Sequence, residues 1–322
     1  MIPIRDVNRS ETFPLMNYAL IGANLLAFFW QLSLGQRLEQ AFFQYGLVPL
    51  RYTDHSLAAR FTLWEQVLPF FTSMFLHGGV LHLLGNMWSL YLFGDNVEDR
   101  LGHVRYLLFY LLCGLTAGIT HLITNADSQI PTIGASGAIS GVMGAYLLLF
   151  PRARILTLLP IFFFLQLAEV PAFLFLGLWF LMQIVSAGAS SGQAGGVAWW
   201  AHIGGFLAGM VLLKIFQRLP RAPVASGFRD RTRRSRTPRM QPLSGTSREQ
   251  ELDIRGWITL TPREAALGTR KLISVPGGFR GRTVLVSIPP GSRDGMVLRL
   301  RGLGGKGPNG RSGDLYLVVR IL

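Results

Sequence analysis

Residues 199–217 read WWAHIGGFLAGMVLLKIFQ, an apolar stretch whose titratable side chains are His202 and Lys214 alone. A helix needs about 20 mostly apolar residues to cross the hydrocarbon core of a bilayer. Similar stretches occur at residues 17–34, 74–93, 104–124, 135–150 and 170–187. The sequence therefore predicts an all-α polytopic membrane domain, a bundle of six spanning helices.

The composition agrees with this prediction. Half of the 322 residues are apolar and 15% are charged, whereas soluble globular proteins carry about 25% charged residues. The net charge of +14 favours an anionic partner, either nucleic acid or a lipid surface. Cys113 is the one cysteine of the sequence, which excludes an internal disulfide framework and a cysteine-rich zinc site.

The placement of charge predicts the orientation of the spans, because cytoplasmic loops carry an excess of Lys and Arg. With the N-terminus inside, the basic residues of 1–16, 100–105, 152–154 and 214–239 all face the cytoplasm. The opposite loops, 121–131 and 188–198, contain no Lys or Arg. We expect a multi-pass membrane protein whose N- and C-termini are both cytoplasmic.

Segment 155–168 is also apolar, but it is short for a span and contains Pro160. A seventh span there would move the basic tail to the outside. We therefore expect this segment to lie at the membrane interface.

The chain changes character at two points. We expect residues 1–218 to form the membrane domain, 219–251 a basic Pro/Ser/Arg-rich linker, and 252–322 a small all-β cytoplasmic domain. The linker is interpreted as a solvated segment that contacts anionic lipid. It has no interleaved aromatic residues and no nucleic-acid motif, so no nucleic-acid partner is expected. Alternating segments between Gly/Pro turns predict strands at 254–260, 269–275, 283–288, 295–300 and 314–322.

Polar residues inside a bilayer are expensive and usually functional. Those noted in the spans are His77, His82, Asn86, Ser136, Ser140 and His202, with His121 at the end of the third span. At about 1.5 Å per helical residue, Ser136, His82 and His202 each lie about 18–24 Å from the cytoplasmic end of their own span. The three therefore fall in one layer, which predicts a polar pocket that water reaches from outside.

Ser136 opens the fourth span within Gly134-Ala-Ser-Gly137. The free backbone N–H groups at a helix start can stabilise an oxyanion. Glycines at helical spacing allow close helix contact and could bring a serine hydroxyl within reach of His202. They are Gly137 and Gly141 on the fourth span and Gly205 and Gly209 on the sixth. The structural alternatives, a capping serine and a hydrogen-bonded core histidine, stay open.

His82 and Asn86 are four residues apart, so they share one helix face. Both can donate a hydrogen bond to a developing oxyanion, although an interhelical polar network would use the same residues. The spans contain neither HExxH nor a pair of aspartates, so we expect no metal, no cofactor and no aspartyl protease.

Taken together, these residues resemble the rhomboid intramembrane serine proteases. The resemblance covers about residues 1–218 and is carried by His77–Asn86, Gly134–Gly137, Ala201–Gly209 and Gly94–Gly102. It implies a six-helix bundle in which Ser136 is the nucleophile and His202 the general base. It also implies an oxyanion hole made of His82, Asn86 and the backbone N–H of Ser136.

The same resemblance implies cleavage of single-span membrane proteins near the outer face, in a bacterial inner membrane. Residues 35–66 would form a loop half immersed in lipid. We expect the site to be shaped by His77, Gly134, Gly137, Gly141, Gly205, Gly209 and Glu98. A catalytically silent scaffold or membrane chaperone that binds transmembrane helices is the alternative. A small-solute transporter is a third reading, but no inverted repeat of broken helices is visible.

Residues 252–322 resemble the C-terminal peptide-binding domain of DnaJ co-chaperones. The likeness rests on segments 258–273, 286–307 and 313–321. The cysteine zinc modules and the His-Pro-Asp motif of that family are absent from the sequence, so stimulation of a heat-shock ATPase is not implied. The resemblance implies a cytoplasmic peptide partner bound along a strand edge. A β domain without a ligand is the alternative.

Overall fold

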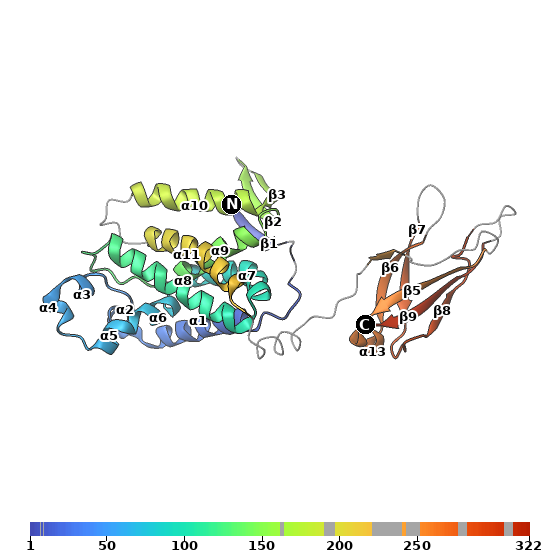
Figure 1. Cartoon of the computed structure of the whole chain (residues 1–322), viewed down its shortest axis with the longest axis horizontal. Coiled ribbons are helices and arrows are strands. Elements are labelled where there is room, and N and C mark those ends of the chain that lie inside the picture. The colour runs from blue at the N-terminus through green and yellow to red at the C-terminus, as the bar shows by residue number, and fades with distance from the viewer. Residues whose placement is uncertain are drawn as a thin grey trace. The chain divides into compact units, whose positions relative to one another are not determined.

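The computed structural model describes residues 1–6, 8, 10–161, 164–189, 197–220, 240–242, 252–275, 282–305 and 312–322. The chain divides into two compact units, Met1–Arg233 and Arg234–Leu322. The first unit is mainly helical and the second is mainly β (Figure 1).

Among the described residues, six helices of fourteen residues or more build the first unit. They are α1 (Leu15–Ser33), α7 (Val80–Leu101), α8 (His103–Thr124), α9 (Ser136–Leu149), α10 (Ala172–Ala189) and α11 (Trp199–Arg218). Five of them begin within two residues of the predicted spans. The second predicted span starts at residue 74, but α7 begins only at Val80, because the chain forms η2 (Ser73–Phe75) and a bend before it.

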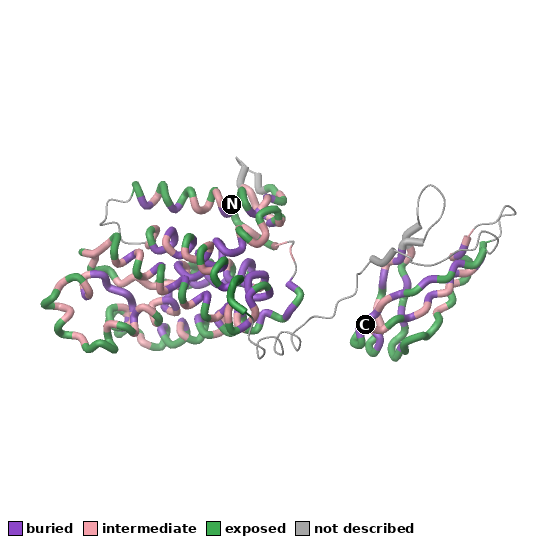
Figure 2. Tube along the Cα trace, viewed as in Figure 1, coloured by how far each residue is buried: buried purple, intermediate pink, exposed green. Residues whose placement is uncertain are grey.

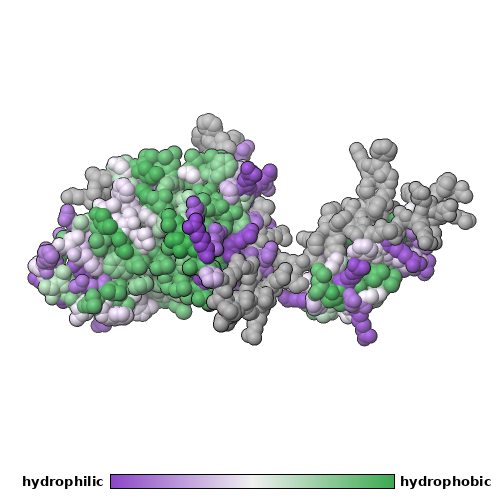
Figure 3. Space-filling model, in the orientation of Figure 1, coloured by the Kyte–Doolittle hydropathy of each residue, from purple (hydrophilic) through white to green (hydrophobic). Residues whose placement is uncertain are grey.

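Four of these helices, α1, α8, α10 and α11, are long and apolar enough to cross a membrane. Leu63–Phe75 and α7 pass the same test only as a pair that is bent by 80°, and α9 is a shorter apolar helix. The face of this unit seen in Figure 3 is largely hydrophobic over the helices. The chain is therefore a multi-pass membrane protein with four or five apolar helices.

Short helices fill the connection between α1 and α7. They are η1 (Gly35–Arg37), α2 (Leu38–Tyr45), α3 (Leu50–Thr53), α4 (His55–Ala58), α5 (Leu63–Val67), α6 (Pro69–Thr72) and η2 (Ser73–Phe75). Thr62 and Glu65 form a capping box that begins α5, and the Asp54 side chain caps α4. Arg51 is buried, donates to the carbonyl oxygen of Phe43, and lies 4.2 Å above the ring of Phe61. The connection is thus a folded element, although Trp64 within it is exposed.

The break before α7 is held by a side chain of α1. The Gln31 amide donates to the His77 carbonyl oxygen at 2.8 Å and accepts from the His77 N–H at 2.9 Å. Buried backbone groups must be paired, so this amide replaces the helical partners that the break removes.

Helix α9 lies at the centre of the first unit and packs against α8 and α11. A Cβ placed on Gly205 would contact the carbonyl oxygen of Gly137, and one on Gly209 would contact that of Gly141. Only glycines allow the two backbones to come this close. Buried residues gather on these central helices, as Figure 2 shows.

The first unit also contains a small sheet that the sequence pattern does not predict. Strands β1 (Ile2–Asp6), β2 (Arg154–Ile161) and β3 (Phe164–Pro171) are antiparallel in the order β1-β2-β3. The described residues of segment 155–168, which are 155–161 and 164–168, therefore belong to the antiparallel strands β2 and β3. Asp6 anchors β1 to the helices, because its carboxylate accepts from Tyr146 Oη at 2.7 Å and from Asn96 Nδ2 at 2.9 Å.

The described part of the second unit contains two three-stranded sheets, with orders β4-β6-β7 and β5-β9-β8. Its elements are β4 (Met240–Pro242), β5 (Ile254–Leu260), α13 (Pro262–Leu267), β6 (Thr269–Val275), β7 (Arg282–Ile288), β8 (Val297–Leu300) and β9 (Leu315–Ile321). Alternate residues of β5 and β9 are buried, and their apolar side chains form the core of this unit together with Ala265, Ile273, Val286 and Ile288. Two of the predicted strands coincide with β5 and β6, and the other three match within two residues. Helix α13 begins with the capping box of Thr261 and Glu264, which the sequence reading did not use.

Candidate active site

Ser136 is the first residue of α9, and the backbone before it has an unusual shape. Gly134 has φ +126°, in a region that residues with a side chain rarely adopt. Its N–H donates to the Ser73 carbonyl oxygen at 2.8 Å, which ties this turn to η2. The turn leaves the half-buried Ser136 at the N-terminal end of the helix, where the first backbone N–H groups have no intrahelical partner.

The structure brings Ser136 and His202 together. Ser136 Oγ lies 2.8 Å from Nε2 of His202, which is on the first turn of α11. The close packing of the glycine faces of α9 and α11 makes this distance attainable. The sequence alone leaves a capping or packing role open for each residue, and the contact between them is the arrangement that a serine nucleophile and its base require.

Gln183 on α10 is a site residue that sequence reasoning missed. Its Oε1 lies 2.8 Å from Nδ1 of His202. The rings of Trp179 and Trp199 lie 6.0 and 6.2 Å from the imidazole, measured between ring centroids. Gln183 could have been found from the sequence as the one amide side chain within the apolar segment 172–189, since polar groups are costly in a bilayer.

His82 and Asn86 converge on the turn that precedes Ser136. A Cβ placed on Gly134 would lie 2.8 Å from His82 Nε2 and 3.7 Å from Asn86 Nδ2. The Gly78 N–H donates to His82 Nδ1 at 3.3 Å, so Nδ1 is the acceptor and Nε2 carries the proton of the neutral ring. Asn86 Nδ2 is buried and has no hydrogen-bond partner within the described part of the chain. Two hydrogen-bond donors are thus directed toward the start of α9.

His77 and Ser140 lie near this site but face other groups. His77 is buried, with its ring 5.1 Å from that of His82 between centroids and tilted by 69°. The Ser140 hydroxyl donates to the Ser136 carbonyl oxygen at 2.7 Å, inside α9. His77 therefore packs against the His82 ring, and Ser140 binds the backbone of α9 rather than another side chain of the site.

Glu98 lies at the other end of α7 from His82, about 24 Å away at 1.5 Å per residue. Its carboxylate accepts from the N–H groups of Met16 and Asn17 and pairs with His103. It fixes the start of α1 against the end of α7 and takes no direct part near Ser136. His121 is near the end of α8, and its Nε2 lies 2.7 Å from Thr132 Oγ1.

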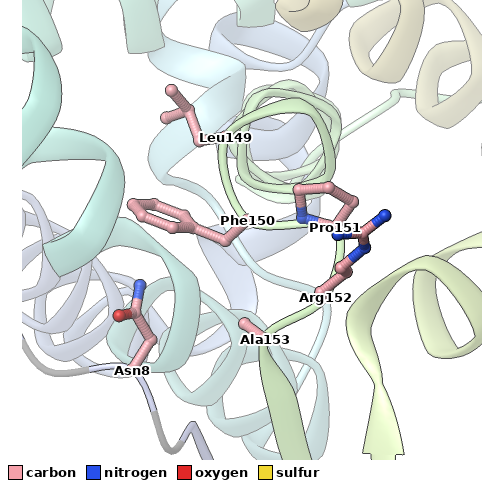
Figure 4. A pocket seen from close by; sticks show the side chains of 6 residues that line it. All are labelled: Asn8, Leu149, Phe150, Pro151, Arg152 and Ala153. Atoms are coloured by element: carbon pink, nitrogen blue, oxygen red, sulfur yellow. The ribbon is translucent and has the colours of Figure 1, made fainter.

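No group of three or more His, Cys, Asp or Glu side chains within the described residues could hold a metal ion. An open pocket of about 440 Å³ lies at the C-terminal end of α9, the end opposite Ser136 (Figure 4). It is lined by Asn8, Leu149, Phe150, Pro151, Arg152 and Ala153. None of these residues belongs to the Ser136–His202 pair, so the pocket is separate from the candidate active site.

Comparison with known proteins assigns both units. Residues 64–219 match the rhomboid domain model, and residues 254–322 match the DnaJ C-terminal domain model. The chain is 34% identical over 141 residues to RHOMBOID-like protein 6, mitochondrial, of Arabidopsis thaliana, a match that covers 44% of this chain and 41% of that protein. It is 33% identical over 135 residues to Rhomboid protease GluP of Bacillus subtilis, which covers 42% of this chain and 24% of that protein.

A third relative is the putative rhomboid protease YdcA of Bacillus subtilis, 40% identical over 95 residues that cover 30% of this chain and 46% of that protein. The chain thus spans less than half of the length of each of these relatives. All three matches are to rhomboid proteins, and the helical unit contains residues 64–219 while the β unit contains 254–322. Residues 64–219 of the helical unit are therefore a rhomboid domain, and residues 254–322 of the β unit are a DnaJ C-terminal domain.

Proposed function

We propose that this protein is an intramembrane serine endopeptidase that uses a dyad of Ser136 and His202. The observation that carries the proposal is the 2.8 Å contact between Ser136 Oγ and His202 Nε2, made by two helices that are far apart in sequence. His202 takes the hydroxyl proton as Ser136 attacks the scissile carbonyl carbon. The proton then passes to the leaving amine, and water hydrolyses the acyl-enzyme.

The negative charge on the attacked carbonyl oxygen needs hydrogen-bond donors in place before the reaction. We assign this role to His82 Nε2, Asn86 Nδ2 and the backbone N–H of Ser136. The unpaired state of buried Asn86 Nδ2 supports the assignment, because an unsatisfied buried donor costs about 1–3 kcal/mol and an oxyanion would satisfy it.

We infer that the substrates are single-span membrane proteins cut near the outer face. A helix in lipid hides its carbonyl groups in intrahelical bonds, so a substrate must unwind locally before Ser136 can attack. Small or helix-breaking residues near the cleaved bond favour that step. GluP and YdcA, which are named as a rhomboid protease and a putative one, support a proteolytic activity here.

We also propose a bacterial inner membrane with both chain ends in the cytoplasm. The excess of Lys and Arg on one side of the spans supports this orientation. Relatives from Bacillus subtilis support the bacterial membrane, while other relatives are named mitochondrial or chloroplastic. A C-terminal tag that is digested by protease added outside intact spheroplasts would contradict it.

The test of the activity uses the full-length protein in liposomes with a labelled single-span substrate. We expect Ser136→Ala to abolish cleavage while the melting temperature in detergent changes little, because one half-buried hydroxyl is lost. A serine-directed fluorophosphonate should label the wild type and not this variant. Cleavage by purified Ser136→Ala would refute the dyad, and a wild type that neither cuts nor labels would leave the binding-only scaffold.

For the DnaJ C-terminal domain we propose that a cytoplasmic peptide, such as a substrate tail, adds to the edge of one of its sheets. The β8 strand supports this, because it ends the order β5-β9-β8 and pairs on one side only within the described residues. The full-length protein should retain more tail peptide on affinity beads than a variant that ends at residue 251. Equal retention would count against the proposal.

A further inference from the structure

Gln183 is a buried amide in an otherwise apolar helix. Its side chain is 4% exposed, and its neighbours on α10 are mainly Leu, Phe, Met and Ile. A buried polar group is tolerated only when its hydrogen bonds are made. Both ends of this amide are paired, one with the imidazole of His202 and one with the backbone of α10 itself.

The backbone contact determines which end of the amide faces the histidine. Gln183 Nε2 donates to the Trp179 carbonyl oxygen at 3.2 Å, and a carbonyl oxygen can only accept. The amide NH2 must therefore face Trp179, which leaves Oε1 toward His202. Because Oε1 can only accept in turn, the ring nitrogen opposite it, Nδ1, must carry a proton.

A neutral imidazole with the proton on Nδ1 has its lone pair on Nε2. Nε2 is the atom that lies 2.8 Å from the Ser136 hydroxyl. We propose that Gln183 is a positioning residue that holds His202 in the one tautomer able to accept the Ser136 proton. This inference rests on the proposed peptidase function and names a third member of its site.

The neutrality of the amide suits its surroundings. In soluble serine proteases an aspartate holds the base, and loss of the correct tautomer there costs about 10⁴-fold in kcat. A carboxylate at position 183 would place a charge in an apolar helix, where ionised groups are strongly disfavoured. A glutamine anchored to its own helix selects the tautomer without that charge, and the rings of Trp179 and Trp199 restrict the tilt of the imidazole.

The experiment replaces Gln183 by methionine, which is similar in length and volume but cannot accept this hydrogen bond. Gln183→Glu, as the uncharged acid that an apolar helix favours, keeps a carbonyl acceptor at the same place. Met182→Leu is the control on an exposed neighbouring position. For Gln183→Met we expect kcat to fall by about 10² or more, by comparison with the aspartate case, with KM within about twofold. Gln183→Glu should recover most of that loss, and Met182→Leu should behave as wild type.

A second measurement does not depend on activity. In the protein labelled with ¹⁵N-histidine, the signals that disappear in His202→Ala belong to His202. They should show a protonated Nδ1 and an unprotonated Nε2 in the wild type, and a mixture of tautomers in Gln183→Met. This measurement tests the role of Gln183 even if no substrate is cleaved. Failure of the peptidase proposal can therefore be told apart from failure of the tautomer proposal.

Three results would overturn the inference. They are a protonated Nε2 in the wild type, full kcat in Gln183→Met, and equal loss in Gln183→Met and Gln183→Glu with the wild-type tautomer kept in both. The last result would show that Gln183 only fills space.

Discussion

The contact between the glycine faces of α9 and α11 should control the rate of cleavage. In Gly205→Ala the new methyl group would contact the carbonyl oxygen of Gly137 far inside normal separation. Carbon–oxygen contacts normally lie at about 3.3–3.6 Å, so α11 must move away from α9 by roughly 1 Å. His202 lies three residues before Gly205 on the same helix, so its Nε2 would move with α11.

A displacement of about 1 Å can lower a rate by about 10²-fold. We therefore expect kcat/KM of Gly205→Ala to fall by about that factor, measured with a fluorogenic single-span substrate in liposomes. Gly177→Ala on α10 is the matched control, because no atom lies within 4 Å of its added Cβ. Both changes gain about 1 kcal/mol of helix propensity, so the difference between them isolates the steric effect. A wild-type rate in Gly205→Ala would refute the reasoning.

Two further predictions concern an oxyanion donor and the β unit. Asn86→Leu should lower kcat by about 10²–10³ with little change in KM, as loss of one oxyanion donor does, and steady-state kinetics with an unchanged far-UV spectrum would test this. Hydrogen bonds from the Gly302 N–H and, to a smaller extent, from Arg299 lower the pKa of Asp314 in the folded protein. The ionised carboxylate therefore stabilises the β unit at pH values above its unfolded pKa. This stabilisation is lost as pH falls through the folded pKa. Hydrogen-exchange protection factors of β9 in the full-length protein, which are corrected for the pH dependence of the chemical exchange step, should fall on acidification in the wild type and less so in Asp314→Asn. Identical protection profiles would contradict the prediction.

Most of the architecture could be predicted because each element leaves a periodic signal. Long apolar stretches gave the six long helices, and the alternation of IRGWITL gave β5 to the residue. The hairpin of β2 and β3 could not be predicted in this way. Its residues are almost continuously apolar, and its pairing with β1 joins segments about 150 residues apart, for which a single sequence carries no signal.

In the candidate site, too, some residues could be predicted from the sequence and others could not. Ser136, His202, His82 and Asn86 stand in recognisable spacings, so their identities could be read from the sequence. Gln183 belongs to no motif, and its role depends on the rotation of α10 against α11, which only tertiary packing sets. The direction of its amide depends further on one backbone carbonyl oxygen, that of Trp179.

The pairing of β1 with β2 has a consequence for biosynthesis. A ribosome adds about 5–20 residues per second, so roughly 8–30 s separate the emergence of Asp6 from that of its partner Ile155. During that interval the first strand has no sheet to join, while α1, α7, α8 and α9 enter the bilayer. The unit that holds Ser136 can close around its N-terminal segment only after about half of the chain has been translated, and a bulky fusion placed just before Ile2 would obstruct that step.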